Sequence, residues 1–129
     1  MFGLEYILDL KSCSTEKFNR EGLTQYFEEL CDLIDMERCD LHFWDYEGFP
    51  EEKAAAPLHL DGTSAIQFIK TSNITIHTLD KVGEIYLNIF SCKSFDDKKV
   101  REFTAKFFRG FAQNETVIYR GTMSDCKNL

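Results

Sequence analysis

The chain has 129 residues, 43% of them hydrophobic and 14% aromatic, a size and composition typical of one compact domain. A disordered chain is excluded, because the rings of 12 Phe and 5 Tyr need burial. The net charge of -7 disfavours nucleic-acid and membrane binding, and no apolar run approaches the roughly 20 residues that span a bilayer.

The first third of the chain predicts strand, helix and strand. Apolar residues alternate over residues 4–10, which predicts a strand. A helix is expected from about Arg20, with Asn19 as its N-cap and an apolar stripe of Leu23, Phe27, Leu30 and Ile34. Alternation resumes over residues 39–44 and predicts a second strand. Residues 46–57 hold Gly48 and both prolines, which predicts a mobile loop with room for a helical turn.

The rest of the chain predicts more strands and one further helix. Residues 64–71, 72–79 and 84–91 are rich in β-branched and aromatic residues, and residues 80–83 suit a hairpin turn between the last two strands. A helix with Ser94 as N-cap is expected to bury Val100, Phe103, Phe107 and Phe111. A last strand over residues 115–120 precedes a loose tail from Gly121. We therefore predict a single α+β domain over residues 1–129, a two-layer sandwich with two helices on one face of a largely antiparallel sheet.

Cysteine and histidine usage indicates neither disulfides nor a metal site. The five cysteines are odd in number and widely spaced, and no C-x-x-C pair occurs; they are Cys13, Cys31, Cys39, Cys92 and Cys126. Reduced thiols and the absence of a visible secretory signal predict a cytoplasmic protein. His42 and His59 have no second ligand at a useful spacing, so no metal is expected. Trp44 is expected in the core.

The densest polar cluster is residues 71–78, Thr-Ser-Asn-Ile-Thr-Ile-His-Thr, followed by Cys92. Taken alone, these residue types are more typical of hydrogen bonding on the solvent face of a strand and of a small buried thiol than of catalysis. The same cluster, however, resembles the central motif of the short prokaryotic type of S-adenosylmethionine decarboxylase proenzyme. That family has Gly-Val-Ser, then Glu-Ser-His-x-x-Ile-His-Thr, then Phe-Thr-Cys-Gly.

The corresponding segments here are residues 62–64 (Gly-Thr-Ser), 71–78 and 90–93 (Phe-Ser-Cys-Lys). Ser72 follows Ser64 by 8 residues, and it precedes His77 by 5 and Cys92 by 20, so the family spacing holds without insertion. The similarity extends weakly over most of the chain.

The resemblance implies a self-processing, pyruvoyl-dependent decarboxylase of polyamine biosynthesis. Ser72 would attack the carbonyl of Thr71, Ser64 would assist, and His77 would be the base that drives β-elimination. Cleavage would leave a β chain of residues 1–71 and an α chain of residues 72–129, with residue 72 converted to a pyruvoyl group. That cofactor would form a Schiff base with the substrate amine and act as an electron sink, and Cys92 would be the proton donor.

Several residues depart from the family pattern. Thr71 and Asn73 replace the Glu and His that flank the serine, and Leu79 and Lys81 replace an aromatic ring and a carboxylate expected at the nucleoside. S-adenosylmethionine is the substrate that the resemblance implies. Arginine or ornithine is the alternative amino-acid substrate, and a non-processing homologue with a binding or regulatory role is a further alternative. The resemblance also implies a homodimer.

Overall fold

Alternating apolar residues pair into a sheet, and two amphipathic helices cover one face of it. The computed structural model describes residues 2–121. Its elements are β1 (Gly3–Lys11), α1 (Arg20–Leu33), β2 (Arg38–Trp44), α2 (Pro50–Ala55), β3 (Ser64–Ile69), β4 (Ser72–Leu79), β5 (Glu84–Ser91), α3 (Asp97–Phe108) and β6 (Phe111–Arg120).

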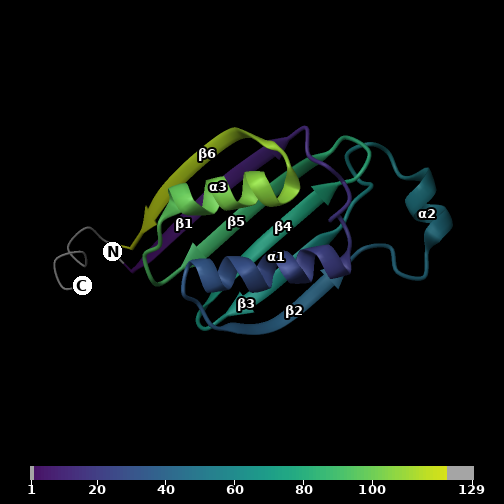
Figure 1. Ribbon diagram of the computed structural model, residues 1–129. Coiled ribbons are helices and arrows are strands. Elements are labelled where there is room, and N and C mark those ends of the chain that lie inside the picture. The colour runs from purple at the N-terminus through teal and green to yellow at the C-terminus, as the bar shows by residue number, and fades with distance from the viewer. Residues whose placement is uncertain (1, 122–129) are drawn as a thin grey trace.

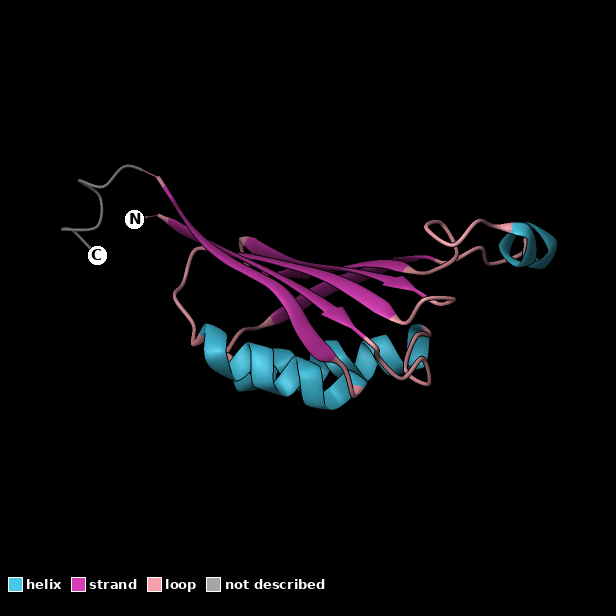
Figure 2. Cartoon of the chain, turned by 90° about the horizontal axis from the view of Figure 1, so that it is seen from above, coloured by secondary structure: helices cyan, strands magenta, loops and turns pink. Residues whose placement is uncertain are grey.

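The six strands form one antiparallel sheet in the order β2-β3-β4-β5-β1-β6. Figure 1 shows α1 and α3 crossing the same face of this sheet. Seen from above, the described residues place no helix on the opposite face, and α2 lies beyond one end of the strands (Figure 2). The predicted α+β two-layer sandwich is therefore confirmed. No helix among the described residues is long and apolar enough to cross a membrane.

The core lies between the helices and the covered face of the sheet. Every second residue of the central strands points into it, so Ile74, Ile76, Ile85 and Leu87 are fully buried. From the helices, Tyr26 stacks on Phe103 with ring centroids 5.6 Å apart, and its hydroxyl pairs with the buried Thr104 hydroxyl at 2.8 Å. Burial raises the pKa of the Tyr26 phenol, which stays neutral in the core. Each large apolar side chain so buried contributes roughly 1.5–3 kcal/mol.

The residues that alternate with the core point to the other side of the sheet, which we call the open face. It carries Trp44 of β2, Ile66 and Phe68 of β3, His77 of β4, and Tyr86 and Phe90 of β5, together with Ile118 of β6. Trp44, Ile66, Phe68 and Ile118 are large and exposed there.

Several predicted boundaries need correction. The second predicted helix begins with Asp96 as N-cap, whose carboxylate accepts from two backbone amides, and Ser94 lies outside it. The helix ends because Arg109 adopts a left-handed conformation (φ 53°), so Phe111 is an exposed residue of β6 and does not belong to the helix core. The final strand accordingly begins at Phe111. The predicted N-cap Asn19 is confirmed, since its side chain accepts from Gly22 N.

One predicted strand in the middle of the chain is also too long. The strand expected over residues 64–71 stops at Ile69, because a two-residue turn separates it from its partner Ser72. The helical turn expected within the loop over residues 46–57 is present as α2, and ion pairs of Lys53 with Asp61 and Asp80 anchor it. The tail predicted from Gly121 lies, beyond that first residue, outside the described residues.

Candidate active site

The turn between β3 and β4 holds its backbone in an unfavourable conformation. Ile69 and Ser72 are paired, which leaves Lys70 and Thr71 as the two turn residues. Thr71 has φ 59°, in the left-handed region that β-branched residues rarely occupy. Such a conformation costs on the order of 1–3 kcal/mol and persists only where surrounding contacts impose it. Strain is therefore stored at the peptide unit that precedes Ser72.

Cys92 lies directly beside this strained unit. Its backbone N–H donates to Ser72 Oγ at 3.0 Å, and its thiol donates to the Thr71 carbonyl oxygen at 3.4 Å. The turn after β5 fixes Cys92, because Ser91 Oγ both accepts from Lys93 N and donates to Lys93 O. These contacts bring together Thr71, Ser72 and Cys92, three of the residues that the sequence singled out.

A pocket of about 320 Å³ opens at this end of the sheet. It is formed where the β3–β4 turn, the end of β5 and the turn that follows α1 meet, and its lining includes Ser72, Cys92, Met36, Lys70 and Lys93. Cys92 is exposed in it. A small substrate can therefore reach the thiol and the peptide unit before Ser72.

The second pair of predicted residues lies at the opposite end of the same hairpin. Ser64 and His77 are paired across β3 and β4, with Ser64 Oγ 2.9 Å from His77 Nδ1. Gly62 is required for this arrangement, since a Cβ there would lie 1.6 Å from the Thr78 carbonyl oxygen. Thr63 N donates to Thr78 Oγ1 at 3.0 Å and fixes the approach to Ser64.

Within one protomer, the four predicted site residues therefore form two pairs that lie far apart: Ser64 with His77, and Ser72 with Cys92. His77 follows Ser72 by five residues along an extended strand, which corresponds to roughly 16 Å at about 3.3 Å per residue. His77 points to the open face, whereas Ser72 is opposite the inward-facing Ile69. Within one protomer His77 therefore cannot reach the peptide unit that precedes Ser72.

A ring-lined pocket surrounds the Ser64–His77 pair. Its volume is about 430 Å³, and Trp44, Tyr46 and Tyr86 contribute aromatic walls. Trp44 is 61% exposed, so its predicted burial in the core is wrong. The sequence reasoning missed Tyr46 and Tyr86 as pocket residues. The signal for Trp44 was its position in β2, where it alternates with the inward-facing Phe43 and falls on the same side as His42.

The remaining candidate residues lie apart from these pairs. His42 packs edge-on against Phe68 on the open face, and His59 lines the ring-lined pocket. The residues from 2 to 121 contain no cluster of three metal-ligating side chains. Their four cysteines are all free, and burial raises the pKa of the Cys13 and Cys31 thiols to about 11. Cys126 lies outside the described residues.

Two comparisons with known proteins both identify S-adenosylmethionine decarboxylases as similar to this chain. The family model described as S-adenosylmethionine decarboxylase matches residues 4–121. A similar solved structure is the crystal structure of the adenosylmethionine decarboxylase from Aquifex aeolicus, with a TM-score of 0.72 and 17% sequence identity over 95% of this chain and 92% of that one. At this identity the match shows a shared fold. No curated protein sequence matches the chain.

Proposed function

Because this chain belongs to the S-adenosylmethionine decarboxylase family, we propose that it is a decarboxylase that cleaves itself between Thr71 and Ser72 and converts Ser72 into a pyruvoyl group. The observation that carries the proposal is the strained Thr71 peptide unit held against Cys92. A carbonyl that accepts a hydrogen bond from the thiol is a better electrophile, and release of the backbone strain favours rearrangement.

The first step is an acyl shift from nitrogen to oxygen. Ser72 Oγ attacks the carbonyl carbon of Thr71, the bond from that carbon to the Ser72 nitrogen breaks, and the hydroxyl proton passes to the departing amine. The product is an ester between Thr71 and the Ser72 side chain. The Cys92 thiol stabilises the developing negative charge on the Thr71 oxygen, since it already donates there at 3.4 Å.

The second step requires a base. Removal of the Cα proton of residue 72 expels the carboxylate of Thr71 by β-elimination, and hydrolysis of the resulting enamine releases ammonia and leaves the ketone. His77 suits this role when its Nδ1–H donates to Ser64 Oγ, because Nε2 then keeps a free lone pair for the proton. Ser64 is thereby a positioning residue for the base.

A second copy of the chain supplies His77 to Ser72. A two-fold axis that runs across the strands reverses their direction, so the Ser64–His77 end of one protomer meets the Ser72–Cys92 end of the other. A two-fold axis along the strands would keep the two pairs apart. The exposed apolar residues of the open face give a face-to-face dimer a surface to bury. We therefore propose a homodimer with two composite active sites.

The ring-lined pocket supports S-adenosylmethionine as the substrate. Leu79 lacks the ring that the family pattern has there, but Trp44, Tyr46 and Tyr86 line the same pocket and offer faces for a purine. Lys81, which replaces a carboxylate, is engaged elsewhere, since its ammonium donates to Ala56 O at 2.7 Å. Once formed, the ketone supplies an electron sink for the loss of carbon dioxide, and the exposed Cys92 thiol is placed to return a proton.

Denaturing mass spectrometry of the purified protein tests the proposal. We expect fragments of residues 1–71 and 72–129, the second with a ketone at its N-terminus, and only the intact chain for Ser72→Ala. Release of carbon dioxide is then compared for S-adenosylmethionine, arginine and ornithine. A wild-type chain that stays intact contradicts self-processing and favours the non-processing binding protein, to which the departures at Thr71 and Asn73 point.

A further inference from the structure

The chain between β2 and β3 is far longer than the pairing of these strands requires. Trp44 and Ser64 are direct partners in the antiparallel ladder, yet about twenty residues separate them, where about two to five commonly suffice. The additional residues carry α2 beyond the end of the sheet (Figure 2). We call residues 46–60 the arm.

Buried and half-buried polar contacts fix the arm at its base. Lys53 of α2 pairs with the buried Asp61 and, at 3.0 Å, with Asp80 in the β4–β5 turn. Burial lowers the pKa of Lys53, but its hydrogen bonds to the two carboxylates outweigh that effect and the net shift is upward. Tyr46 also closes the arm on itself, because its hydroxyl donates to Leu60 O at 2.7 Å. These contacts therefore hold the arm in one position beyond the end of the sheet.

The braced arm presents apolar side chains to solvent. Phe49, Leu58 and Leu60 are 61%, 60% and 54% exposed, and Trp44 at the base continues this surface onto the open face. Side chains of this size are seldom left uncovered in such a group unless another polypeptide packs on them. The arm and the open face thus form one continuous surface for a partner.

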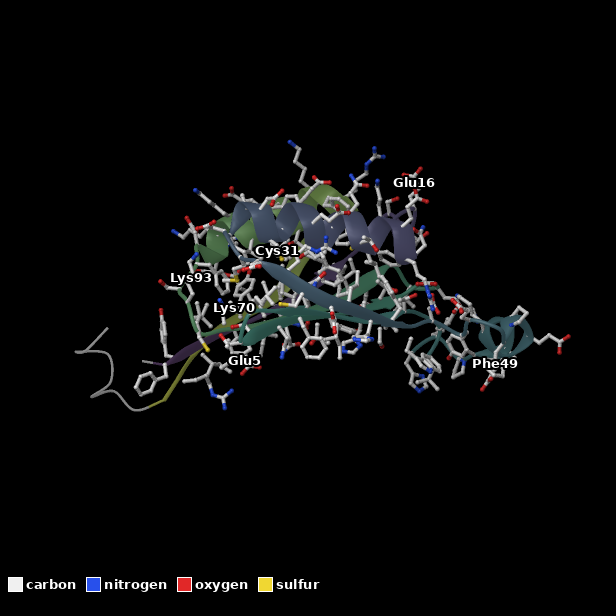
Figure 3. All side chains as sticks on the ribbon, turned by 90° about the horizontal axis from the view of Figure 1, so that it is seen from below. Glu5, Glu16, Cys31, Phe49, Lys70 and Lys93 are labelled. Carbon is white, nitrogen blue, oxygen red and sulfur yellow. The ribbon has the colours of Figure 1, made fainter. Side chains whose placement is uncertain are left out.

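The dimer geometry places this surface beside the active site of the second protomer. Phe49 lies at one end of the molecule, and Lys70 and Lys93 lie at the other (Figure 3). A two-fold axis across the strands brings these ends together. The lining of the Ser72–Cys92 pocket holds two carboxylates, Asp35 and Glu37, beside its two lysines, and Lys93 already pairs with Asp35 at 3.2 Å. Lys70 has no ion pair among the described residues. The exposed acidic residues Glu51 and Glu52 of α2 then approach Lys70, and opposite charges are complementary across that contact.

We infer that the arm of each protomer packs over the Ser72–Cys92 pocket of the partner subunit and forms its outer wall. Phe49 supplies apolar contact at the pocket rim, and Glu51 and Glu52 pair with Lys70 of the partner subunit. The occupant of the arm surface is a second copy of this chain. The inference rests on the composite dimer of the proposed function, and it adds a wall of the substrate site that the sheet alone lacks.

Photocrosslinking tests the contact directly. Benzoylphenylalanine replaces Phe49 in the full-length chain, and the dimer is assembled from labelled and unlabelled protomers so that crosslinks between chains differ in mass from those within one chain. We expect crosslinks between chains at residues 69–72 and 91–93. The same probe at Glu16, which lies on the helix side (Figure 3), is the matched control and should give none of these crosslinks.

Charge reversal provides an independent readout. The variant with Glu51→Lys and Glu52→Lys should raise the dimer dissociation constant roughly ten-fold, because each contact occurs twice in a two-fold dimer, and added Lys70→Glu should restore most of that loss. A dimer that cleaves itself but shows Phe49 crosslinks only within one chain overturns the arm contact and leaves the proposed function intact. A chain that neither dimerises nor cleaves overturns both.

Discussion

Two inactive variants should rescue one another if the active site is shared between protomers. Ser72→Ala removes the proposed nucleophile at one end of the β3–β4 hairpin, and His77→Ala removes the proposed base at the other. In a dimer that contains one chain of each kind, one composite site has both defects. The other site combines Ser72 of the His77→Ala chain with His77 of the Ser72→Ala chain and is complete.

The structure predicts what fraction of the active sites is intact in the mixed dimers. Because about 16 Å of strand separates Ser72 from His77, no chain can complete its own site. In purified mixed dimers about half of the sites should be intact, and in a random mixture about a quarter. Cleavage should be restricted to the His77→Ala chain, since the Ser72→Ala chain lacks the residue that is converted.

Coexpression of the two variants with different affinity tags, followed by two-step purification and denaturing mass spectrometry, measures this. The matched control combines Ser64→Ala with His77→Ala: these residues form one pair on one protomer, so the mixed dimer has no complete site and should not exceed its parents. Mixed dimers of Ser72→Ala and His77→Ala that stay uncleaved would refute the composite site.

Three further outcomes are expected. His77→Ala should stop at the ester, so hydroxylamine should split that variant between residues 71 and 72; resistance to hydroxylamine would exclude an acyl shift before the base acts. Cys92→Ala should still yield some fragments but lose turnover by about 10²-fold or more in a carbon dioxide release assay, and normal turnover would remove its role as proton donor. Tyr26→Phe leaves the Thr104 hydroxyl unpaired in the core, which should cost about 1–3 kcal/mol in urea unfolding. The double variant with Thr104→Val should recover part of this loss, and an equal or larger loss in the double variant would show that the hydrogen bond is not the cause.

The fold class could be predicted because burial follows local periodicity. Alternation over residues 4–10, 72–79 and 84–91 assigns one face of each strand to the core, and a shift by one residue would reverse every side chain. Boundaries were harder to predict where a single residue decides them. The left-handed Arg109 ends α3. Gly110 directly after it is a residue that commonly follows a helix end, but Phe111 at helical spacing from Phe107 favoured a longer helix.

The sequence by itself determined the candidate site residues, because the spacing of Ser64, Ser72, His77 and Cys92 is a property of the chain. Only the tertiary structure decided which of them meet. Five residues can form a turn that brings its ends together or a strand that holds them about 16 Å apart, and the pairing of β3 with β4 selects the strand. Likewise, Cys92 contacts Thr71 because β5 pairs with β4. The order of strands in the sheet depends on tertiary packing, which the local sequence pattern does not reveal.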